Sequence, residues 1–149
     1  MRLAVFSLVL LSSACSQKQA PGPRIELVEA PATGVIATYV AQEVARGAQD
    51  HVPVLVYVGA TWCEPCREFH DAAAAGSLDA ALAPVRFLVF DLDRDGERLA
   101  TAGYRSELVP LFARPGADGR ASGTQTDGVK QGGAYLEQLV PRIRALAGR

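Results

Sequence analysis

Two cysteines three positions apart, directly after an apolar run, constrain this chain more than any other feature. The run from Val52 to Val58 is rich in β-branched residues, which is typical of a strand covered on both faces. Cys63 and Cys66 follow it, and a helix starting at Cys63 would place their sulfurs one turn apart. The pattern predicts a strand, a turn and a helix whose first turn carries a dithiol able to form a disulfide.

The cysteine count favours a chemical role over a structural crosslink. The chain has three cysteines in 149 residues, and Cys15 lies in a segment with the pattern of an export signal. A small scaffold held together by disulfides would need more cysteines at longer spacings. A bond that closes a two-residue gap restricts little of the unfolded chain. We therefore interpret Cys63 and Cys66 as a reactive pair.

The start of the chain predicts export. Arg2 precedes the apolar run Leu3 to Leu11, which is too short to span a bilayer. Residues 1–15 resemble a bacterial lipoprotein signal, in which Cys15 would become the lipidated N-terminus, although Ser12 stands where leucine is usual. Cleavage before Cys15 by an ordinary signal peptidase is the alternative, and it would give a soluble periplasmic protein. Either route leads to an oxidising compartment.

Composition limits the remaining possibilities. Residues 16–24 are mostly polar, with two prolines and a glycine, and predict a linker. Residues 25–149 suffice for one domain with a single core. A net charge of −1 gives no basis for nucleic-acid binding, and an apolar fraction of 49% indicates a folded chain. We expect a monomer without a cofactor.

Hydrophobic spacing predicts an α/β sandwich with a mixed central sheet. Thr33 is a candidate N-cap of the first helix, and Gly47 is its expected end. Further along, a turn at 93–96 should separate the second buried strand from a short helix. Pro141 should kink the last helix or mark an earlier break. The expected order is a short strand at 25–28, a helix to Gly47, a strand at 53–58, a helix at 63–75, a short turn through Leu82, a strand at 85–92, a helix at 97–104, strands at 110–114 and 121–126, and a final helix containing Leu136 to Ala147.

The helix start gives the two thiols different expected roles. Unpaired N–H groups and the helix dipole stabilise a thiolate, so Cys63 should be the nucleophile. Cys66, one turn further in, should be more shielded and should resolve the mixed disulfide. Pro65 has no N–H to give, which costs little in a first turn. Glu64 adds a negative charge that opposes thiolate formation.

Metal binding is an alternative use of the same cysteines. Cys63, Cys66 and His70 have the spacing C-x2-C-x3-H, and His51 could supply a fourth ligand. The chain has no second pair of this kind, and the strand-turn-helix setting is typical of a redox motif. The haem-attachment motif requires a histidine directly after the second cysteine. Arg67 occupies that position, so this motif is excluded.

The chain from about Ile25 to Leu146 resembles the thioredoxin superfamily. The matching segments are Val54 to Val58, then Gly-Ala-Thr-Trp-Cys-Glu-Pro-Cys at 59–66, and Leu-Val-Pro-Leu-Phe at 108–112. The Glu-Pro dipeptide is similar to that of membrane-anchored thiol reductases of cytochrome c maturation. Arg-Glu-Phe at 67–69 resembles the thioredoxin-like periplasmic domain of an electron-transferring membrane reductase.

The resemblance implies roles for residues outside the motif. Pro110 would be a cis-proline facing the cysteines, with Val109 pairing to an extended partner backbone, and Trp62 would offer docking surface. Tyr57 stands where thioredoxins commonly have a buried aspartate that takes a proton from the second thiol. A phenol with a pKa near 10 is a poor base, so we expect Tyr57 to fill the core.

These observations predict an exported, lipid-anchored thiol–disulfide oxidoreductase, acting as a reductase. Its partners would be envelope proteins with thiols or disulfides, together with an unidentified redox partner that recharges the site. A metallochaperone that uses Cys63, Cys66 and His70 is one alternative. A lipoprotein that holds a partner through a vestigial site is another.

Overall fold

The fold is a five-stranded mixed sheet with helices on both faces, as the sequence predicts. The computed structural model describes residues 22–128 and 134–148. The strands are β1 (Ile25–Glu29), β2 (Val54–Gly59), β3 (Val85–Asp91), β4 (Leu111–Pro115) and β5 (Ala121–Asp127). They lie in the order β1-β3-β2-β4-β5. The pairs β1–β3 and β3–β2 are parallel, whereas β2–β4 and β4–β5 are antiparallel.

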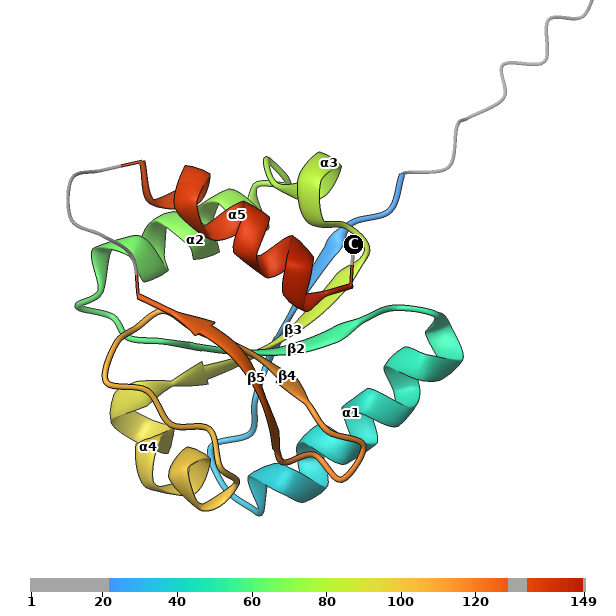
Figure 1. Cartoon of the computed structure of the whole chain (residues 1–149), viewed down its shortest axis with the longest axis vertical. Coiled ribbons are helices and arrows are strands. Elements are labelled where there is room, and N and C mark those ends of the chain that lie inside the picture. Colours follow the sequence, from blue (N-terminus) through green and yellow to red (C-terminus); the bar gives the residue numbers. More distant parts are fainter. Residues whose placement is uncertain (1–21, 129–133, 149) are drawn as a thin grey trace, which may run out of the picture.

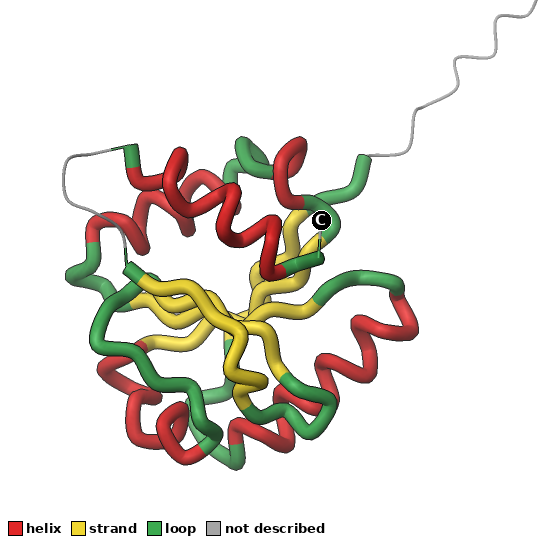
Figure 2. The backbone as a smooth tube through the Cα atoms, in the orientation of Figure 1, coloured by secondary structure: helices red, strands yellow, loops and turns green. Residues whose placement is uncertain are grey.

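Two layers of helices enclose this sheet. Figure 1 and Figure 2 show α2, α3 and α5 above one face and α1 and α4 below the other. The parallel strands require crossover connections, and helices provide them. The helices are α1 (Ile36–Asp50), α2 (Glu64–Ala74), α3 (Asp79–Leu82), α4 (Leu92–Thr101) and α5 (Tyr135–Leu146).

Strand β2 carries the chain into the cysteine motif, and its residues alternate between two cores. Leu55 and Tyr57 pack in the core beneath α2 and α5, whereas Val56 and Val58 pack in the core beneath α1 and α4. All four side chains are buried. A strand covered on both faces needs apolar residues at every position, which explains the continuous apolar run.

Phe69 fixes helix α2 on the sheet. Its ring lies 5.1 Å from that of Tyr57, 5.3 Å from Phe87 and 4.8 Å from Phe112, measured between centroids. Burial of a phenylalanine side chain stabilises a fold by about 1.5–3 kcal/mol. Because Phe69 lies three residues after Cys66, this contact also fixes the position of the cysteine pair.

Helix α1 differs from the prediction at both ends. It begins at Ile36 rather than after Thr33, because Arg98 of α4 donates hydrogen bonds to the carbonyls of Ala32 and Gly34 and holds that segment outside the helix. Gly47 is inside the helix and is no stop signal. A Cβ atom there would lie 2.6 Å from the carbonyl oxygen of Val52, so the glycine permits a close approach of the following chain.

Helix α4 occupies the segment that the sequence predicts to be a turn. It runs from Leu92 to Thr101, so the prediction of a turn at 93–96 is wrong. The helix predicted at 97–104 is confirmed over residues 97–101, but it begins five residues earlier and ends three residues earlier than expected. The Asp91 side chain caps it by accepting a hydrogen bond from the Arg94 N–H at 2.9 Å. Asp95 is fully buried and accepts hydrogen bonds from the guanidinium groups of Arg94 and Arg98.

Helix α5 continues through Pro141, so the expected break before it is absent. Leu139, Ile143 and Leu146 are buried, as the helical spacing predicts. Pro141 removes one backbone hydrogen bond, and packing of the apolar face against the sheet offsets that loss.

The N-terminal predictions fall outside the described residues. These comprise the signal-like segment 1–15 with Cys15 and most of the linker 16–24. Within the part of the chain that the structure describes, no helix combines the length and the apolar character needed to cross a membrane.

Candidate functional site

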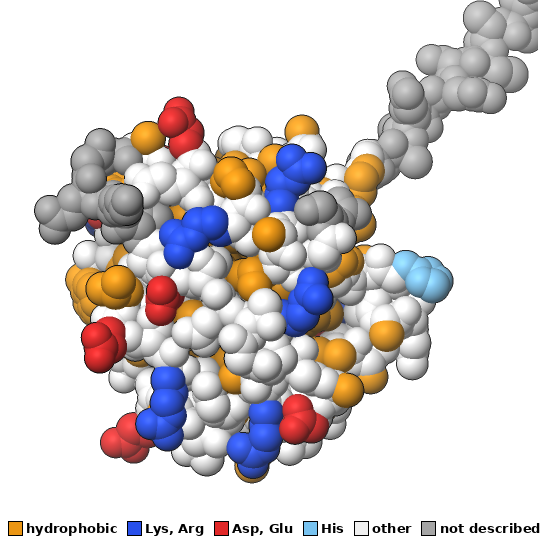
Figure 3. Space-filling view, in the orientation of Figure 1, with side chains coloured by type: hydrophobic (Ala, Val, Ile, Leu, Met, Phe, Trp, Pro, Cys, Tyr) orange, Lys and Arg blue, Asp and Glu red, His pale blue; other side chains and the backbone are white. Residues whose placement is uncertain are grey.

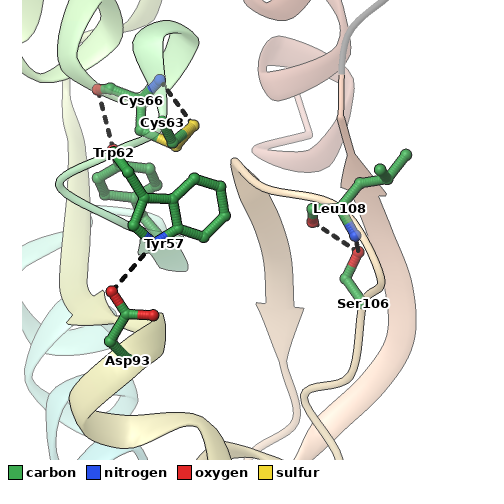
Figure 4. The surroundings of a disulfide bond; sticks show 7 residues. All are labelled: Tyr57, Trp62, Cys63, Cys66, Asp93, Ser106 and Leu108. Atoms are coloured by element: carbon green, nitrogen blue, oxygen red, sulfur yellow. Dashed lines mark hydrogen bonds between the residues drawn. A yellow bond between two sulfur atoms is a disulfide. The ribbon is translucent and has the colours of Figure 1, made fainter.

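The cysteine pair lies at the start of helix α2, where the sequence places it. Strand β2 ends at Gly59, and Cys63 is the extended N-cap residue of α2. Its sulfur accepts a hydrogen bond from the Cys66 N–H at 3.2 Å (Figure 4). Pro65 occupies the first turn of the helix, and Glu64 is exposed beside it. This N–H donor and the position at the helix N-terminus favour the thiolate form of Cys63.

Cys63 and Cys66 form a disulfide bond. Their Cα atoms are 5.2 Å apart. Cys63 is 5% exposed and Cys66 is 2% exposed, so Cys66 is the more shielded of the two, as expected for a resolving thiol. Both sulfurs pack in a small apolar cluster with Ala60, which Leu92 and Val109 border. The structure thus presents the oxidised form of a dithiol at a helix N-terminus.

Tyr57 fills the core beneath the disulfide and also contacts the motif. Its ring stacks on Phe112 with centroids 5.0 Å apart, and its hydroxyl donates a hydrogen bond to the Cys66 carbonyl oxygen at 3.1 Å. Burial, with the charge of Glu29 as a second cause, raises the pKa of Tyr57 far above the value of a free phenol. The hydroxyl therefore keeps its proton and supports the backbone of α2 instead of acting as a base.

Trp62 lies on the surface beside the disulfide. It is 63% exposed, which rules out plain core packing. Its indole Nε1–H donates a hydrogen bond to the Asp93 carboxylate at 3.0 Å, as Figure 4 shows. This bond fixes the orientation of a large apolar surface next to Cys63. The sequence analysis missed Asp93 because it assigned residues 93–96 to a turn.

The segment before β4 forms the wall that faces the disulfide. The Val109–Pro110 peptide bond is cis, as the resemblance implies. Val109 packs against the cluster of Cys63 and Cys66, and the exposed side chain of Leu108 lies across from Trp62 in Figure 4. Two large exposed apolar side chains, Trp62 and Leu108, therefore lie near the disulfide.

Ser106 and Asp127 hold this wall in place, and the sequence analysis did not identify either residue. The Ser106 hydroxyl accepts a hydrogen bond from the Leu108 N–H at 3.0 Å and is hydrogen-bonded to the Asp127 carboxylate. The Gly128 N–H donates to the Pro110 carbonyl at 3.0 Å. The local sequence hints at this arrangement through Ser106 alone, which lies two residues before the Leu-Val-Pro segment. A serine hydroxyl commonly accepts a hydrogen bond from the backbone N–H two residues later.

An apolar pocket continues from this wall toward helix α4. Its volume is about 350 Å³. Leu92 and Val109 belong both to its lining and to the border of the disulfide cluster, so the pocket and the disulfide are adjacent. The pocket is further lined by Val58, Leu99, Tyr104 and Leu111, and by Arg105, Ser106 and Glu107.

The predicted metal ligands do not converge. His51 lies at the end of α1 and lines a different pocket from the one that Cys66 and His70 line. Among the residues of 22–128 and 134–148, no group of three or more His, Cys, Asp or Glu side chains is arranged to hold a metal ion. The geometry thus gives no support to the C-x2-C-x3-H interpretation.

Comparison with known proteins identifies the fold. No protein-family model and no curated protein matches the sequence. Among solved structures, oxidised thioredoxin O1 from Arabidopsis thaliana superposes with a TM-score of 0.51 at 17% sequence identity, covering 82% of this chain and 98% of that chain. This chain has a thioredoxin-like fold.

A poplar thioredoxin h has a similar structure, with a TM-score of 0.49, 20% identity, and coverage of 80% of this chain and 96% of that chain. At such identities the likeness concerns the backbone arrangement. One fold can support many functions, so the residues of the site determine the function of this thioredoxin-like chain.

Proposed function

We propose that this protein is a thiol–disulfide oxidoreductase that reduces disulfides of other proteins. The observation that carries the proposal is the Cys63–Cys66 disulfide at the N-terminus of α2, with Val109 packed against it. A structural crosslink would not require an exposed tryptophan on one side and an exposed leucine on the other. These side chains are the surface that an extended protein substrate would contact.

The reaction exchanges one disulfide for another and transfers two electrons. In the reduced protein, the Cys63 thiolate attacks one sulfur of the substrate disulfide, and the other substrate sulfur leaves as a thiolate and takes up a proton. Cys66 then loses its proton and attacks the Cys63 sulfur. The Cys63–Cys66 bond forms, and the second substrate sulfur leaves as a thiolate.

The helix start gives Cys63 the first role. Its sulfur accepts the Cys66 N–H and lies where the helix dipole stabilises negative charge. The thiolate, which is the nucleophilic form of a cysteine, is favoured at such a position. Glu64 opposes this effect only weakly because it is exposed to solvent.

We further propose that the protein works in an oxidising compartment, attached to the periplasmic face of a bacterial membrane through a lipid on Cys15. The signal-like residues 1–15 support this location, and a soluble periplasmic form is the alternative. Its substrates would be envelope proteins, and a separate redox partner would return it to the dithiol form. The resemblance of the Glu-Pro dipeptide to membrane-anchored reductases supports the direction of reduction.

Insulin reduction by dithiothreitol tests the proposed activity. The full chain should accelerate precipitation of the insulin B chain, and Cys63→Ser should reduce the rate to that of dithiothreitol alone. Serine is a good N-cap, so this variant should keep helix α2. The matched control is Cys15→Ser, which removes the cysteine outside the motif and should retain full activity. Equal rates for the wild type and Cys63→Ser would contradict the proposal.

A further inference from the structure

A pocket beside the motif reaches the resolving cysteine. It has a volume of about 240 Å³, and its lining includes Cys66 but not Cys63. His70 also lines it, since residues four apart lie on the same face of helix α2. A water molecule occupies about 30 Å³ of liquid volume, so the pocket has room for several. The other lining residues are Glu29, Tyr57, Gly59, Ala60, Thr61, Arg67, Val89, Phe90 and Asp91.

The proposed function requires a proton acceptor near Cys66, and the inference that follows rests on that function. Cys66 is 2% exposed, so its thiol has little contact with bulk solvent. It must nevertheless lose a proton before it can attack Cys63. Tyr57 cannot accept that proton, because its hydroxyl is a donor to the Cys66 carbonyl and burial raises its pKa.

His70 is the lining residue suited to this task. Its side chain is 43% exposed, so a proton taken from the pocket can pass to bulk solvent. Nε2 lies 4.0 Å from a Glu29 carboxylate oxygen, and Nδ1 lies 3.9 Å from a carboxylate oxygen of Asp71. The imidazole therefore lies between two carboxylates, with one near each ring nitrogen.

The other charged groups that line the pocket are less suited. Asp91 already accepts the Arg94 N–H as the cap of α4. Arg67 carries a positive charge and has no lone pair to offer. Glu29 is largely exposed, and a carboxylate is a weaker base than an imidazole toward a thiol. An imidazole ordinarily exchanges protons between about pH 5 and 8.

We propose that His70, assisted by Glu29, receives the proton of the Cys66 thiol through the solvent of this pocket during resolution of the mixed disulfide. The thiol S–H bond breaks and its electron pair stays on sulfur, which forms the bond to Cys63. The bond between the substrate sulfur and the Cys63 sulfur breaks, and the substrate sulfur leaves as a thiolate with the electron pair of that bond. The proton passes by way of pocket solvent to the imidazole and then to bulk water. His70 acts through solvent, in place of the aspartate that Tyr57 replaces.

The test separates the two half-reactions in the full chain carrying Cys15→Ser. The reduced protein is mixed with an aromatic disulfide that releases one coloured nitrothiobenzoate when Cys63 attacks and a second when Cys66 resolves. Both phases are followed by stopped-flow absorbance between about pH 5 and 8. The variants are His70→Asn, Glu29→Gln and Glu68→Gln, which is the matched control because Glu68 is exposed on α2 and does not line the pocket.

We expect His70→Asn to leave the first phase unchanged and to slow the second about tenfold near neutral pH. This is less than the roughly 10²–10⁴-fold contribution of direct general-base catalysis, because the proton crosses solvent. The rise of the second phase between about pH 5 and 8 should be lost. Glu29→Gln should slow the second phase by less than His70→Asn does, because the imidazole remains. Glu68→Gln should match the parent.

A purely structural role for His70 would not produce this pattern. In a further variant, His70→Ala, added imidazole should accelerate the second phase more than it does in the parent. An unchanged second-phase pH profile in His70→Asn would overturn the relay while leaving the proposed function intact. Absence of both releases in the parent protein would instead overturn the proposed function.

Discussion

Helices α2 and α4 begin in the same way but serve different purposes. They follow the adjacent parallel strands β2 and β3, whose last residues, Gly59 and Asp91, are register partners. Each helix has an extended N-cap whose side chain accepts the N–H three residues later, from Cys66 to Cys63 at 3.2 Å and from Arg94 to Asp91 at 2.9 Å. The cap atom is a sulfur in α2 and a carboxylate oxygen in α4.

This difference shows how one local geometry can provide either stability or reactivity. A carboxylate is charged at neutral pH, so the Asp91 cap stabilises α4 permanently. A thiol is a weak acceptor until it ionises, so the helix stabilises the thiolate and thereby activates Cys63. The point where β3 passes into α4, here called the α4 junction, is also reinforced by the buried Asp95, which binds Arg94 and Arg98. The α2 junction is the corresponding point between β2 and α2. At the start of α2, the Tyr57 hydroxyl donates to the Cys66 carbonyl, and no buried carboxylate network like that of Asp95 is present there among the described residues.

The strongest way to break the α4 junction is Asp95→Asn. The amide would place N–H donors against two guanidinium groups at a fully buried position. We expect the free energy of unfolding to fall by about 3 kcal/mol, measured by urea denaturation. Glu97→Gln, an exposed change on the same helix, should alter it by less than about 0.5 kcal/mol. Similar losses for both variants would mean that Asp95 does not stabilise α4 through this network.

Removal of each cap compares the two junctions directly. Asp91→Ala should destabilise the reduced protein by about 1 kcal/mol, and Asp91→Ser should recover most of that loss. Cys63→Ala should cost only a few tenths of a kcal/mol at low pH, where the thiol is neutral, because a neutral thiol is a weak acceptor. Thermal denaturation under reducing conditions measures both. An equal cost for the two alanine variants would show that the sulfur caps the helix as strongly as the carboxylate.

Tyr57→Phe tests the support beneath α2. It removes the hydrogen bond to the Cys66 carbonyl and should lower stability by about 1 kcal/mol at neutral pH. The pKa of Tyr57 is raised in the folded protein, so the folded state retains its proton where the unfolded chain releases it. Stability should therefore fall as pH rises above about 10. This fall should be shallower in Tyr57→Phe, and Tyr104 and Tyr39, whose pKa values burial also raises, contribute to the remainder.

The smallest expected effect concerns the bond that joins the two junctions. Asp93→Ala removes the acceptor of the Trp62 indole N–H and frees an exposed ring. Stability should change by less than about 0.5 kcal/mol. The chain has one tryptophan, so its fluorescence anisotropy reports this site alone and should fall. Unchanged anisotropy would show that the hydrogen bond does not orient Trp62.

The sequence predicts the elements whose determinants are local. Apolar runs indicate β2 and β3, and the Cys-x-x-Cys spacing after β2 indicates the start of α2. The Leu-Val-Pro segment indicates the facing wall through its resemblance to a known family. These features depend on neighbouring residues, so they can be read without the tertiary structure.

The features that the sequence analysis missed depend on distant contacts. Residues 93–96 have the composition of a turn, but burial of Asp95 between two arginines makes them helical. Arg98 reaches carbonyls of the 31–34 segment, which moves the start of α1 to Ile36. Ser106 and Asp127 are 21 positions apart in the sequence, so no local pattern reveals that they meet beside the site.

Capture of a mixed disulfide tests the central claim most directly. Two full-chain variants in a Cys15→Ser background, Cys66→Ala and Cys63→Ala, are reduced and mixed with a disulfide-bonded protein substrate, and the adducts are located by peptide mass spectrometry. The account predicts a stable adduct on Cys63 in Cys66→Ala and little or none on Cys66 in Cys63→Ala. Equal capture by the two cysteines, or capture by Cys66 alone, would contradict the assignment of Cys63 as the nucleophile.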